Sequence, residues 1–335
     1  MQVRSTSPHG KAGFLSQMLI SDTTERALIE RIRSRVPTSP DWVTLGIGDD
    51  AAVLEPARGE LDVVTTDGQV EGVHFDRTWM SMYDVGWKAL AVNISDLAAM
   101  GATPRGATLS LALPSTLPIE EFDALVDGFL ALAKETRVPL IGGNLARSPG
   151  PIMIDVTLIG SGRRRRLLTR GGGRAGHLLY VTGTLGRVAA HVADAQRGAL
   201  TRGAVTPCPL LPVSPASRLQ CGQQAAWNKV ASGCMDISDG LADAVSQMAA
   251  ASGTGARILS SKIPVDVAST LDLALSGGED YELLFAVPLR RRRGFEQIAG
   301  RHADVTCIGE LTNKPGAILD RDGVSEPLGQ GFSHF

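Results

Sequence analysis

The chain is poor in aromatic residues, in cysteine and in long apolar runs, and each shortage excludes a class of protein. Aromatic residues make up 4% of the 335 residues, and the four cysteines are widely spaced with no CxxC pair. This spacing predicts neither a zinc site nor a disulfide framework and is typical of a reducing compartment. No apolar run approaches the ~20 residues that span a bilayer, and residues 1–17 lack the apolar centre of a signal peptide. We therefore expect a cytoplasmic protein without a membrane segment.

The chain also lacks an excess of either charge. Its net charge of −2 provides no general attraction to nucleic acid or to an anionic membrane, so we expect neither partner. Two short basic runs, Arg163–Arg166 and Arg290–Arg293, are the local exceptions. We interpret the first as a solvated loop and the second as the start of a helix.

Glycine, in contrast, is abundant, with 38 residues against an average share of about 7%. Many glycines with few aromatics indicate tight turns and places where the backbone approaches a ligand closely. The 43% hydrophobic and 20% charged residues are those of an ordinary globular protein. A chain of this length predicts two packed domains.

Hydrophobic periodicity predicts alternating strands and helices, and therefore a mixed α/β (α+β) fold. The expected helices are 23–35, 82–100, 119–137, one beginning at 187, 216–231, 241–252 and 290–299. The expected strands are 42–47, 51–54, 61–66, 108–113, 139–141, 151–160, 178–182, 235–237, 256–259, 281–287 and 305–311. An Arg- and Gly-rich stretch at 168–176 predicts the connection between domains. We expect a flexible tail at 1–20, an N-terminal domain at 21–168 and a C-terminal domain at 169–335.

Several separate segments place acids beside glycine or serine. They are GIGDD (46–50), TTDG (65–68), NISD (93–96), MDISDG (235–240) and SGGED (276–280). One such segment alone is ordinary turn chemistry. Asp96, however, lies in an apolar helical pattern, where an acid needs a partner. Asp236 and Asp239 bracket a strand-to-helix transition, the place where ligands gather in α/β sheets.

Acids that converge without basic neighbours repel one another, and a hard divalent cation removes that cost. Gly142-Gly143-Asn144 follows an apolar strand, where backbone N–H groups can face an anion. Arg170 can form a bidentate contact with a phosphate. The P-loop, the protein-kinase motifs and the Rossmann fingerprint are absent. The sequence therefore predicts magnesium-assisted binding of a phosphate-rich ligand at a site of another type.

In this order the motifs resemble those of the thiamine-monophosphate kinase family. That family belongs to the superfamily of aminoimidazole-ribotide synthetase, selenophosphate synthetase and the hydrogenase-maturation dehydratase. The resemblance runs from about residue 20 to the end and is carried by GIGDDAAVL (46–54), TTDGQVEGVHF (65–75), KALAVNISDLAAMGATP (88–104), IGGN (141–144), LLTR (167–170), VTGTLG (181–186), MDISDGL (235–241), SGGEDYELLF (276–285) and GFSHF (331–335).

The resemblance implies a two-domain aminoimidazole-ribotide synthetase-like fold. It implies that the N-terminal sheet lies at a homodimer interface and that a C-terminal α/β domain follows. The ligands that it implies are ATP, several Mg²⁺ ions and thiamine monophosphate. By position, the metal ligands are Asp50, Thr65, Thr66, Asp67, Asp96, Asn144, Asp236 and Asp239. The ATP-binding residues are Gly143, Asn144, Arg170 and Ser238, and the substrate-binding residues are His74, Glu279 and Phe332.

The activity implied by the resemblance is direct in-line transfer of the γ-phosphoryl group of ATP to thiamine monophosphate, which gives thiamine diphosphate and ADP. The acceptor is a phosphate monoester with a second pKa near 6, so no general base and no protein nucleophile are expected. The chain departs from the family pattern at Asn144, where Asp is usual, at the following Leu145 and Ala146, and at Gly68. Asn offers magnesium a carbonyl oxygen without charge.

Two alternative functions remain open from the sequence. One is another ATP-using reaction of the same superfamily on a different small molecule. Its selenophosphate branch calls for a reactive cysteine near the N-terminus, whereas the first cysteine of this chain is Cys208. The other is a weakened relative that binds nucleotide or thiamine phosphate as a regulator, for which Asn144 is the only sign. His74 and Phe332 also have plain structural interpretations, as a core histidine and a packing residue.

Overall fold

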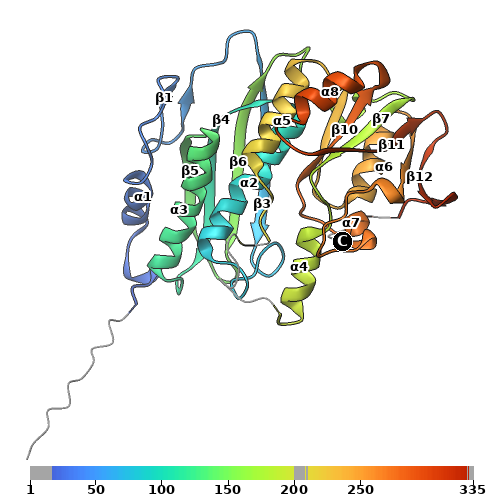
Figure 1. Ribbon diagram of the computed structural model, residues 1–335. Coiled ribbons are helices and arrows are strands. Elements are labelled where there is room, and N and C mark those ends of the chain that lie inside the picture. Colours follow the sequence, from blue (N-terminus) through green and yellow to red (C-terminus); the bar gives the residue numbers. More distant parts are fainter. Residues whose placement is uncertain (1–16, 200–207, 209, 330, 332–335) are drawn as a thin grey trace, which may run out of the picture.

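The N-terminal half is built on a four-stranded sheet that is covered on one face. The structure is a computed structural model that describes residues 17–199, 208, 210–329 and 331. The strand order is β3-β6-β4-β5, in which only β4 and β5 are parallel. The strands are β3 (Leu61–Val70), β4 (Thr103–Pro114), β5 (Leu140–Ser148) and β6 (Met153–Gly162). Helices α2 (Met82–Met100) and α3 (Ile119–Thr136) pack on one face (Figure 1).

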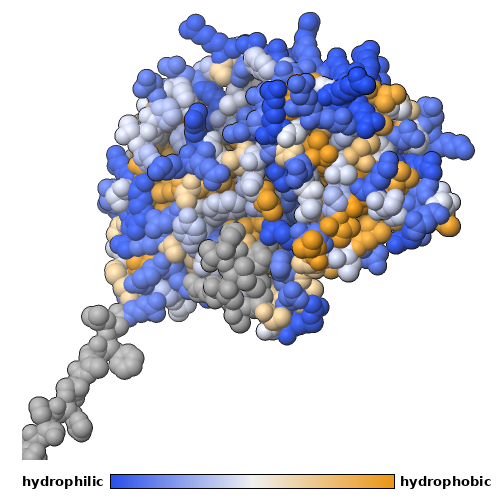
Figure 2. Space-filling view, in the orientation of Figure 1, coloured by the Kyte–Doolittle hydropathy of each residue, from blue (hydrophilic) through white to orange (hydrophobic). Residues whose placement is uncertain are grey.

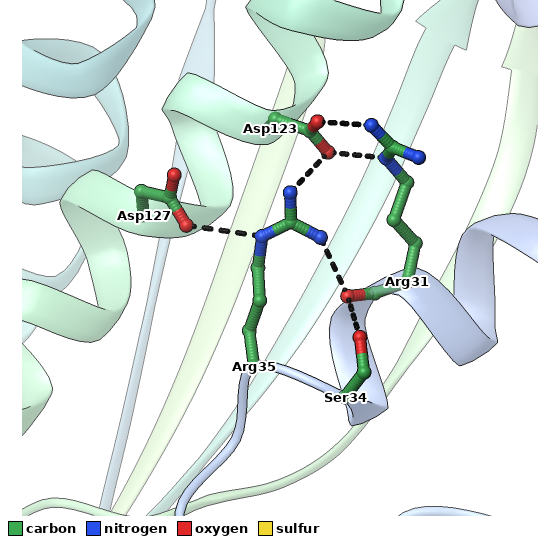
Figure 3. A network of polar contacts seen from close by, with 5 residues as sticks. All are labelled: Arg31, Ser34, Arg35, Asp123 and Asp127. Carbon is green, nitrogen blue, oxygen red and sulfur yellow. Dashed lines mark hydrogen bonds and ion pairs between the residues drawn. The ribbon is translucent and has the colours of Figure 1, made fainter.

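A short helix and a hairpin flank this sheet. They are α1 (Glu25–Arg33) and the antiparallel pair β1 (Val43–Leu45) and β2 (Val53–Leu54). Figure 3 shows how ion pairs fix α1 to α3: Arg31 forms a bidentate contact with Asp123. Arg35 reaches Asp123 at 3.0 Å and Asp127 at 3.1 Å. Because these charges form a network, they hold α1 more firmly than isolated surface pairs would.

The C-terminal half is a seven-stranded sheet between two layers of helices. Its order is β13-β12-β9-β11-β7-β10-β8, and all neighbours are antiparallel except β12 and β9. The strands are β7 (His177–Thr182), β8 (Gly233–Ile237), β9 (Gly255–Leu259), β10 (Glu282–Pro288), β11 (Val305–Thr312), β12 (Gly316–Arg321) and β13 (Val324–Pro327). The helices are α4 (Arg187–Gln196), α5 (Pro215–Trp227), α6 (Leu241–Ala251), α7 (Leu271–Ser276) and α8 (Arg292–Ala299). Single 3-10 turns occur at Ile20–Asp22, Arg170–Gly172, Ser260–Lys262 and Leu289–Arg291.

Helix α2 joins the two halves. Fourteen of its 19 residues are buried, so it is enclosed on nearly all sides, as expected of a core helix. It packs against α3 within its own half and against α5 of the other half. The approach to α5 is tight, because a Cβ added at Gly222 would lie 1.9 Å from the carbonyl oxygen of Ala98. One apolar core consequently runs from the four-stranded sheet through α2 to α5 and α8.

The mixed α/β class predicted from the sequence is confirmed. The expected helix at 82–100 has those bounds, and Gly101 ends it in the left-handed conformation, with φ 63°. The helix α7 and the hairpin β12–β13 were missed. The prediction that a strand ends at 141 was wrong, because β5 continues to Ser148. In the part of the chain that the structure describes, no helix has the length and apolar character needed to cross a membrane.

The contact between α2 and α3 yields a stability prediction. A Cβ at Gly86 would lie 1.9 Å from the carbonyl oxygen of Leu125. Replacing a mid-helix glycine by alanine normally stabilises a helix by about 0.5–1 kcal/mol, but at Gly86 the backbones would have to separate. We therefore expect Gly86→Ala to lower the thermal unfolding midpoint.

Gly294 in α8 is the matched control, since a Cβ there meets only Val230, at 3.5 Å. Gly294→Ala should keep or raise the midpoint. If Gly86→Ala were to stabilise the protein as much as Gly294→Ala, the close approach of α2 and α3 would be refuted.

Candidate functional site

A group of aspartates gathers where the two halves meet. Strand alternation points Thr65 and Asp67 of β3 towards α2, where the Thr65 hydroxyl donates a hydrogen bond to Asp96. The neighbouring Ser95 hydroxyl donates to Asp236 at the end of β8, at 2.9 Å. The cluster therefore takes its acids from both halves of the chain, and α2 lies between them.

The carboxyl groups of this cluster have raised pKa values, because they are buried and lie near one another. Burial first, and then the charges of Asp96, Asp155 and Asp239, raise the pKa of Asp67 from 3.8 to about 6. Burial, followed by the charge of Asp96, raises the pKa of Asp236 to about 7. Burial also raises the pKa of Asp96, although the Thr65 hydrogen bond and the charge of Arg170 oppose that shift. Such crowding of acids is characteristic of a site that receives cations.

Arg170 is a basic residue whose charge acts on these acids, because it opposes the rise in the pKa of Asp96 and of Asp236. It begins the 3-10 turn Arg170–Gly172, and its guanidinium donates to Gln247 of α6, which in turn donates to Asp243. The turn is held against the start of β8 by a hydrogen bond from the Cys234 N–H to the Thr169 carbonyl, at 3.2 Å. Arg170 is therefore positioned beside the aspartates by its own backbone and by α6.

The loop that carries Glu279 is strained and well anchored. Glu279 and Tyr281 have φ values of 69° and 50°, a conformation that costs non-glycine residues energy and often marks functional sites. The Glu279 N–H donates to the Ser238 carbonyl at 2.6 Å. Asp280 turns the other way and accepts from the N–H groups of Gly186 and Val188 at the start of α4. Asp280 thus holds the loop so that Glu279 projects separately.

Lys88 joins two of the residues assigned to the substrate. Its side chain is 1% exposed, and its ammonium donates to Glu279 Oε1 and to the His74 carbonyl, at 2.7 Å each. The His74 ring accepts from the Val70 N–H through Nδ1, at 3.1 Å. Lys88 was missed from the sequence, although a lone lysine in an apolar helix was the available signal.

Other predicted site residues lie on the opposite side of the four-stranded sheet. Asp50, Gly143 and Asn144 line a pocket of about 980 Å³ between α1, the loop 46–52 and β5. The Thr66 side chain also points to this face, where its hydroxyl donates to Asp155 at 3.2 Å. Within one chain, these four residues therefore do not join the side chains of the aspartate cluster.

The expected phosphate-facing loop at Gly142-Gly143-Asn144 is instead the middle of β5. A Cβ at Gly143 would lie 2.0 Å from the Leu109 carbonyl oxygen, so glycine here allows close pairing with β4. Ser238 lies beside the cluster and donates to Asp239 at 2.8 Å. Phe332 falls outside the described residues, but a Cβ at Gly331 would lie 2.3 Å from the Asp239 carbonyl oxygen.

Two family models match the chain, one in each half. Residues 48–161 match the N-terminal domain, and residues 174–321 the C-terminal domain, of AIR synthase related proteins. The fold and the position of its site thus define a protein of the AIR synthase related class.

Within that class, the thiamine-monophosphate kinase of Escherichia coli K12 is 38% identical over 327 residues, which are 93% of this chain and 98% of that protein. The crystal structure of thiamine-monophosphate kinase from Stenotrophomonas maltophilia K279a has a TM-score of 0.77 at 36% identity and covers 90% of this chain and 98% of its own. AaThiL complexed with AMPPCP and TMP has a TM-score of 0.72 at 31% identity, with coverages of 84% and 89%. The chain belongs to the thiamine-monophosphate kinase family.

The raised pKa of Asp236 predicts opposite effects of one substitution on stability and on turnover. Asp236 takes up a proton on folding between its ordinary pKa of 3.8 and its raised pKa of about 7. The stability of the cation-free protein should therefore fall as the pH rises through that window. Asp236→Asn removes the buried charge and keeps an acceptor for Ser95. At pH 8 in EDTA, we expect a higher unfolding midpoint for this variant than for the unaltered protein.

The same variant should lose turnover, because an amide binds cations more weakly than a carboxylate does. The measurement is thermal unfolding at pH 6 and pH 8 with and without Mg²⁺. A lower midpoint for Asp236→Asn in EDTA at pH 8 would contradict the view that the Asp236 charge is unfavourable in the cation-free protein.

Proposed function

We propose that the chain transfers the γ-phosphoryl group of ATP to thiamine monophosphate and so makes thiamine diphosphate and ADP. The observation that carries this proposal is the convergence of Asp67, Asp96 and Asp236 beside Arg170 in a member of the thiamine-monophosphate kinase family. The relative AaThiL, complexed with AMPPCP and TMP, supports both ligands. The reaction is a direct in-line transfer between two anions.

We propose that several Mg²⁺ ions serve this reaction. The residues fit such ions, because buried carboxylates with raised pKa values lack an equal number of basic partners. Asp67, Asp96, Asp236 and Asp239 would hold them, with Thr65 beside Asp96. Bound magnesium neutralises charge on the transferring phosphoryl group. Among the described residues, no group of three or more His, Cys, Asp or Glu side chains is arranged to hold a metal ion by itself, so substrate phosphates would have to supply further ligands.

The chain's own residues then bind and orient the two substrates. Arg170 and Ser238 stand beside the aspartates, where they can donate to nucleotide phosphates. Lys88 fixes Glu279 and the His74 backbone together, which positions the proposed thiamine-phosphate side of the site. No residue needs to remove a proton, because a phosphate monoester is largely ionised at neutral pH.

The regulator hypothesis rests on Asn144 alone. It is weakened because Asp67, Asp96 and Asp236 are all present in the aspartate cluster. We further propose a cytoplasmic protein whose units are residues 21–168 and 169–335, preceded by a tail at 1–20. The division is supported by the two sheets, because the last strand of the first ends at Gly162 and the first strand of the second begins at His177.

Turnover tests the proposed reaction directly. Purified protein with ATP, Mg²⁺ and thiamine monophosphate should form thiamine diphosphate, measured by chromatography. Asp96→Asn should reduce kcat by about 10²-fold or more, because it removes charge from the centre of the cluster, while circular dichroism stays unchanged.

Asp322→Asn is the matched control, since Asp322 is an exposed aspartate in the turn between β12 and β13, away from the aspartate cluster and from the uncovered face of the four-stranded sheet. Near-normal rates for Asp96→Asn would contradict the metal assignment. Tight binding of both substrates without product would favour the regulator instead.

We propose that the uncovered face of the four-stranded sheet pairs with a second copy of the chain. Val64 and Met153 are 63% and 49% exposed there. A two-fold dimer would also unite the two groups of site residues, with Asp50 and Asn144 of one copy facing the aspartate cluster of the other.

Mixed dimers test this sharing of residues. Asp50→Asn and Asp96→Asn should each be inactive alone. After random re-pairing of equal amounts, activity should return to about one quarter of wild type, because half of the dimers would hold one intact site of two.

Mixing Asp96→Asn with Asp236→Asn is the control. These residues share one cluster in one chain, and their mixture should stay inactive. If the first mixture shows no recovery although size measurements confirm dimers, the site residues come from a single copy.

A further inference from the structure

A second pocket collects the two basic runs that the sequence keeps far apart. It has a volume of about 770 Å³ and lies between the domain connection, the end of α5 and the turn after β10. Six cationic side chains line it: Arg165, Arg166, Arg174, Lys229, Arg290 and Arg291. Figure 2 shows strongly hydrophilic surface over α5 and α8 in this region. The interpretation of the runs as an unrelated loop and helix start therefore missed their convergence.

None of the described residues that line this pocket carries a carboxylate. Among the described residues, no ion pair involves Arg165, Arg174, Lys229, Arg290 or Arg291. This contrasts with the adjoining Arg292, which pairs with Glu296 at 2.9 Å outside the pocket. Among the described residues, the cations that line the concavity thus have no acid partner.

His177 lies near basic residues of two segments that are far apart in the sequence, Arg174 and Arg290. Burial lowers the pKa of its imidazole first, and the charges of Arg174 and Arg290 lower it further. Its Nδ1 lies 2.8 Å from the Ser232 hydroxyl. The imidazole therefore stays neutral beside two guanidinium groups, in a position where it can add a polar contact without adding charge.

The residues that frame the pocket are closely packed. A Cβ at Gly172 would lie 1.8 Å from the Ser232 carbonyl oxygen, so the connection is pressed against the start of β8. On the other side, Trp227 holds Arg166 and Arg163 over its ring, at 3.9 and 5.4 Å from the ring centroid. Like charges fixed around a concavity repel one another, and an anion of matching charge relieves that repulsion.

We propose that this pocket binds an anion of two or three linked phosphates, at a site separate from the aspartate cluster. A single phosphate would leave most of the six cations uncompensated, whereas linked phosphates present several oxygens to several guanidinium groups. The volume lies within the usual range of about 300–1,000 Å³ for small-molecule sites. The pocket shares no lining residue with the aspartate cluster, although Gly172 follows Arg170 by two positions.

Isothermal titration with inorganic tripolyphosphate, and separately with ADP, tests the proposal. The full-length protein is used in EDTA at 150 mM salt, where the aspartate cluster repels anions. We expect one tripolyphosphate per chain, and an affinity at least about tenfold lower in Arg165→Glu/Arg290→Glu. Tighter binding of ADP than of tripolyphosphate that is lost in Arg165→Glu/Arg290→Glu identifies a nucleotide as the source of the phosphates, and tighter binding of tripolyphosphate identifies a free polyphosphate.

Arg164→Glu/Arg293→Glu is the matched control, because it makes the same charge change in the same two runs outside the pocket lining. It should bind tripolyphosphate within about threefold of the unaltered protein. Both variants should keep the unfolding midpoint and the basal turnover, because neither touches the aspartate cluster. Equal loss in both variants would show only diffuse attraction and overturn the proposal. It is likewise overturned by absent binding, or by single-stranded RNA that displaces tripolyphosphate and binds less well in the control variant.

Discussion

The structure depends on the burial of like charges around α2. Asp67, Asp96 and Asp236 come from a strand, a helix and a second strand, and each has a raised pKa that burial causes first. Such an arrangement opposes folding, and the large apolar core on both sides of α2 offsets it. The close contacts of α2 with α3 and α5 fix the position of the helix that carries Asp96. A loosely held helix would let the carboxylates move apart.

Apolar spacing and helix-ending glycines predicted the helix that this packing requires. The same local patterns failed for strands that are defined by pairing with other strands. The helix at 82–100 was readable from its apolar spacing and from Gly101. The hairpin β12–β13 was not, because residues 324–327 are mostly exposed and show no apolar alternation. Strand β5 was shortened in the prediction because paired glycines usually indicate a turn. Here Gly143 lets two backbones approach instead.

The sequence indicated the kinds of residue in the candidate site better than it indicated which of their side chains lie together. Carboxylates beside glycine and an arginine in a glycine-rich connection indicated segments that the structure brings together around α2. Sequence neighbours nevertheless separate, because side chains in a strand alternate between faces. Thr65 points to Asp96, whereas Thr66 points to Asp155 on the other face of the sheet. Neither composition nor spacing states which side chains share one face of the sheet with residues from the other half, so that part of the site could be seen only in the structure.

The net charge of −2 does not reveal that two arginines four residues apart, Arg170 and Arg174, lie in different electrostatic surroundings. Arg170 faces the buried acids and lowers the pKa values of Asp96 and Asp236, so its own charge is compensated. Arg174, only four residues later, lies in a pocket without a carboxylate. The chain turns at Arg170–Gly172, so Arg170 lies beside the acids whereas Arg174 lines the basic pocket. The lack of an acid partner among the described residues distinguishes the lining residues of the basic pocket from Arg292 beside them, which pairs with Glu296.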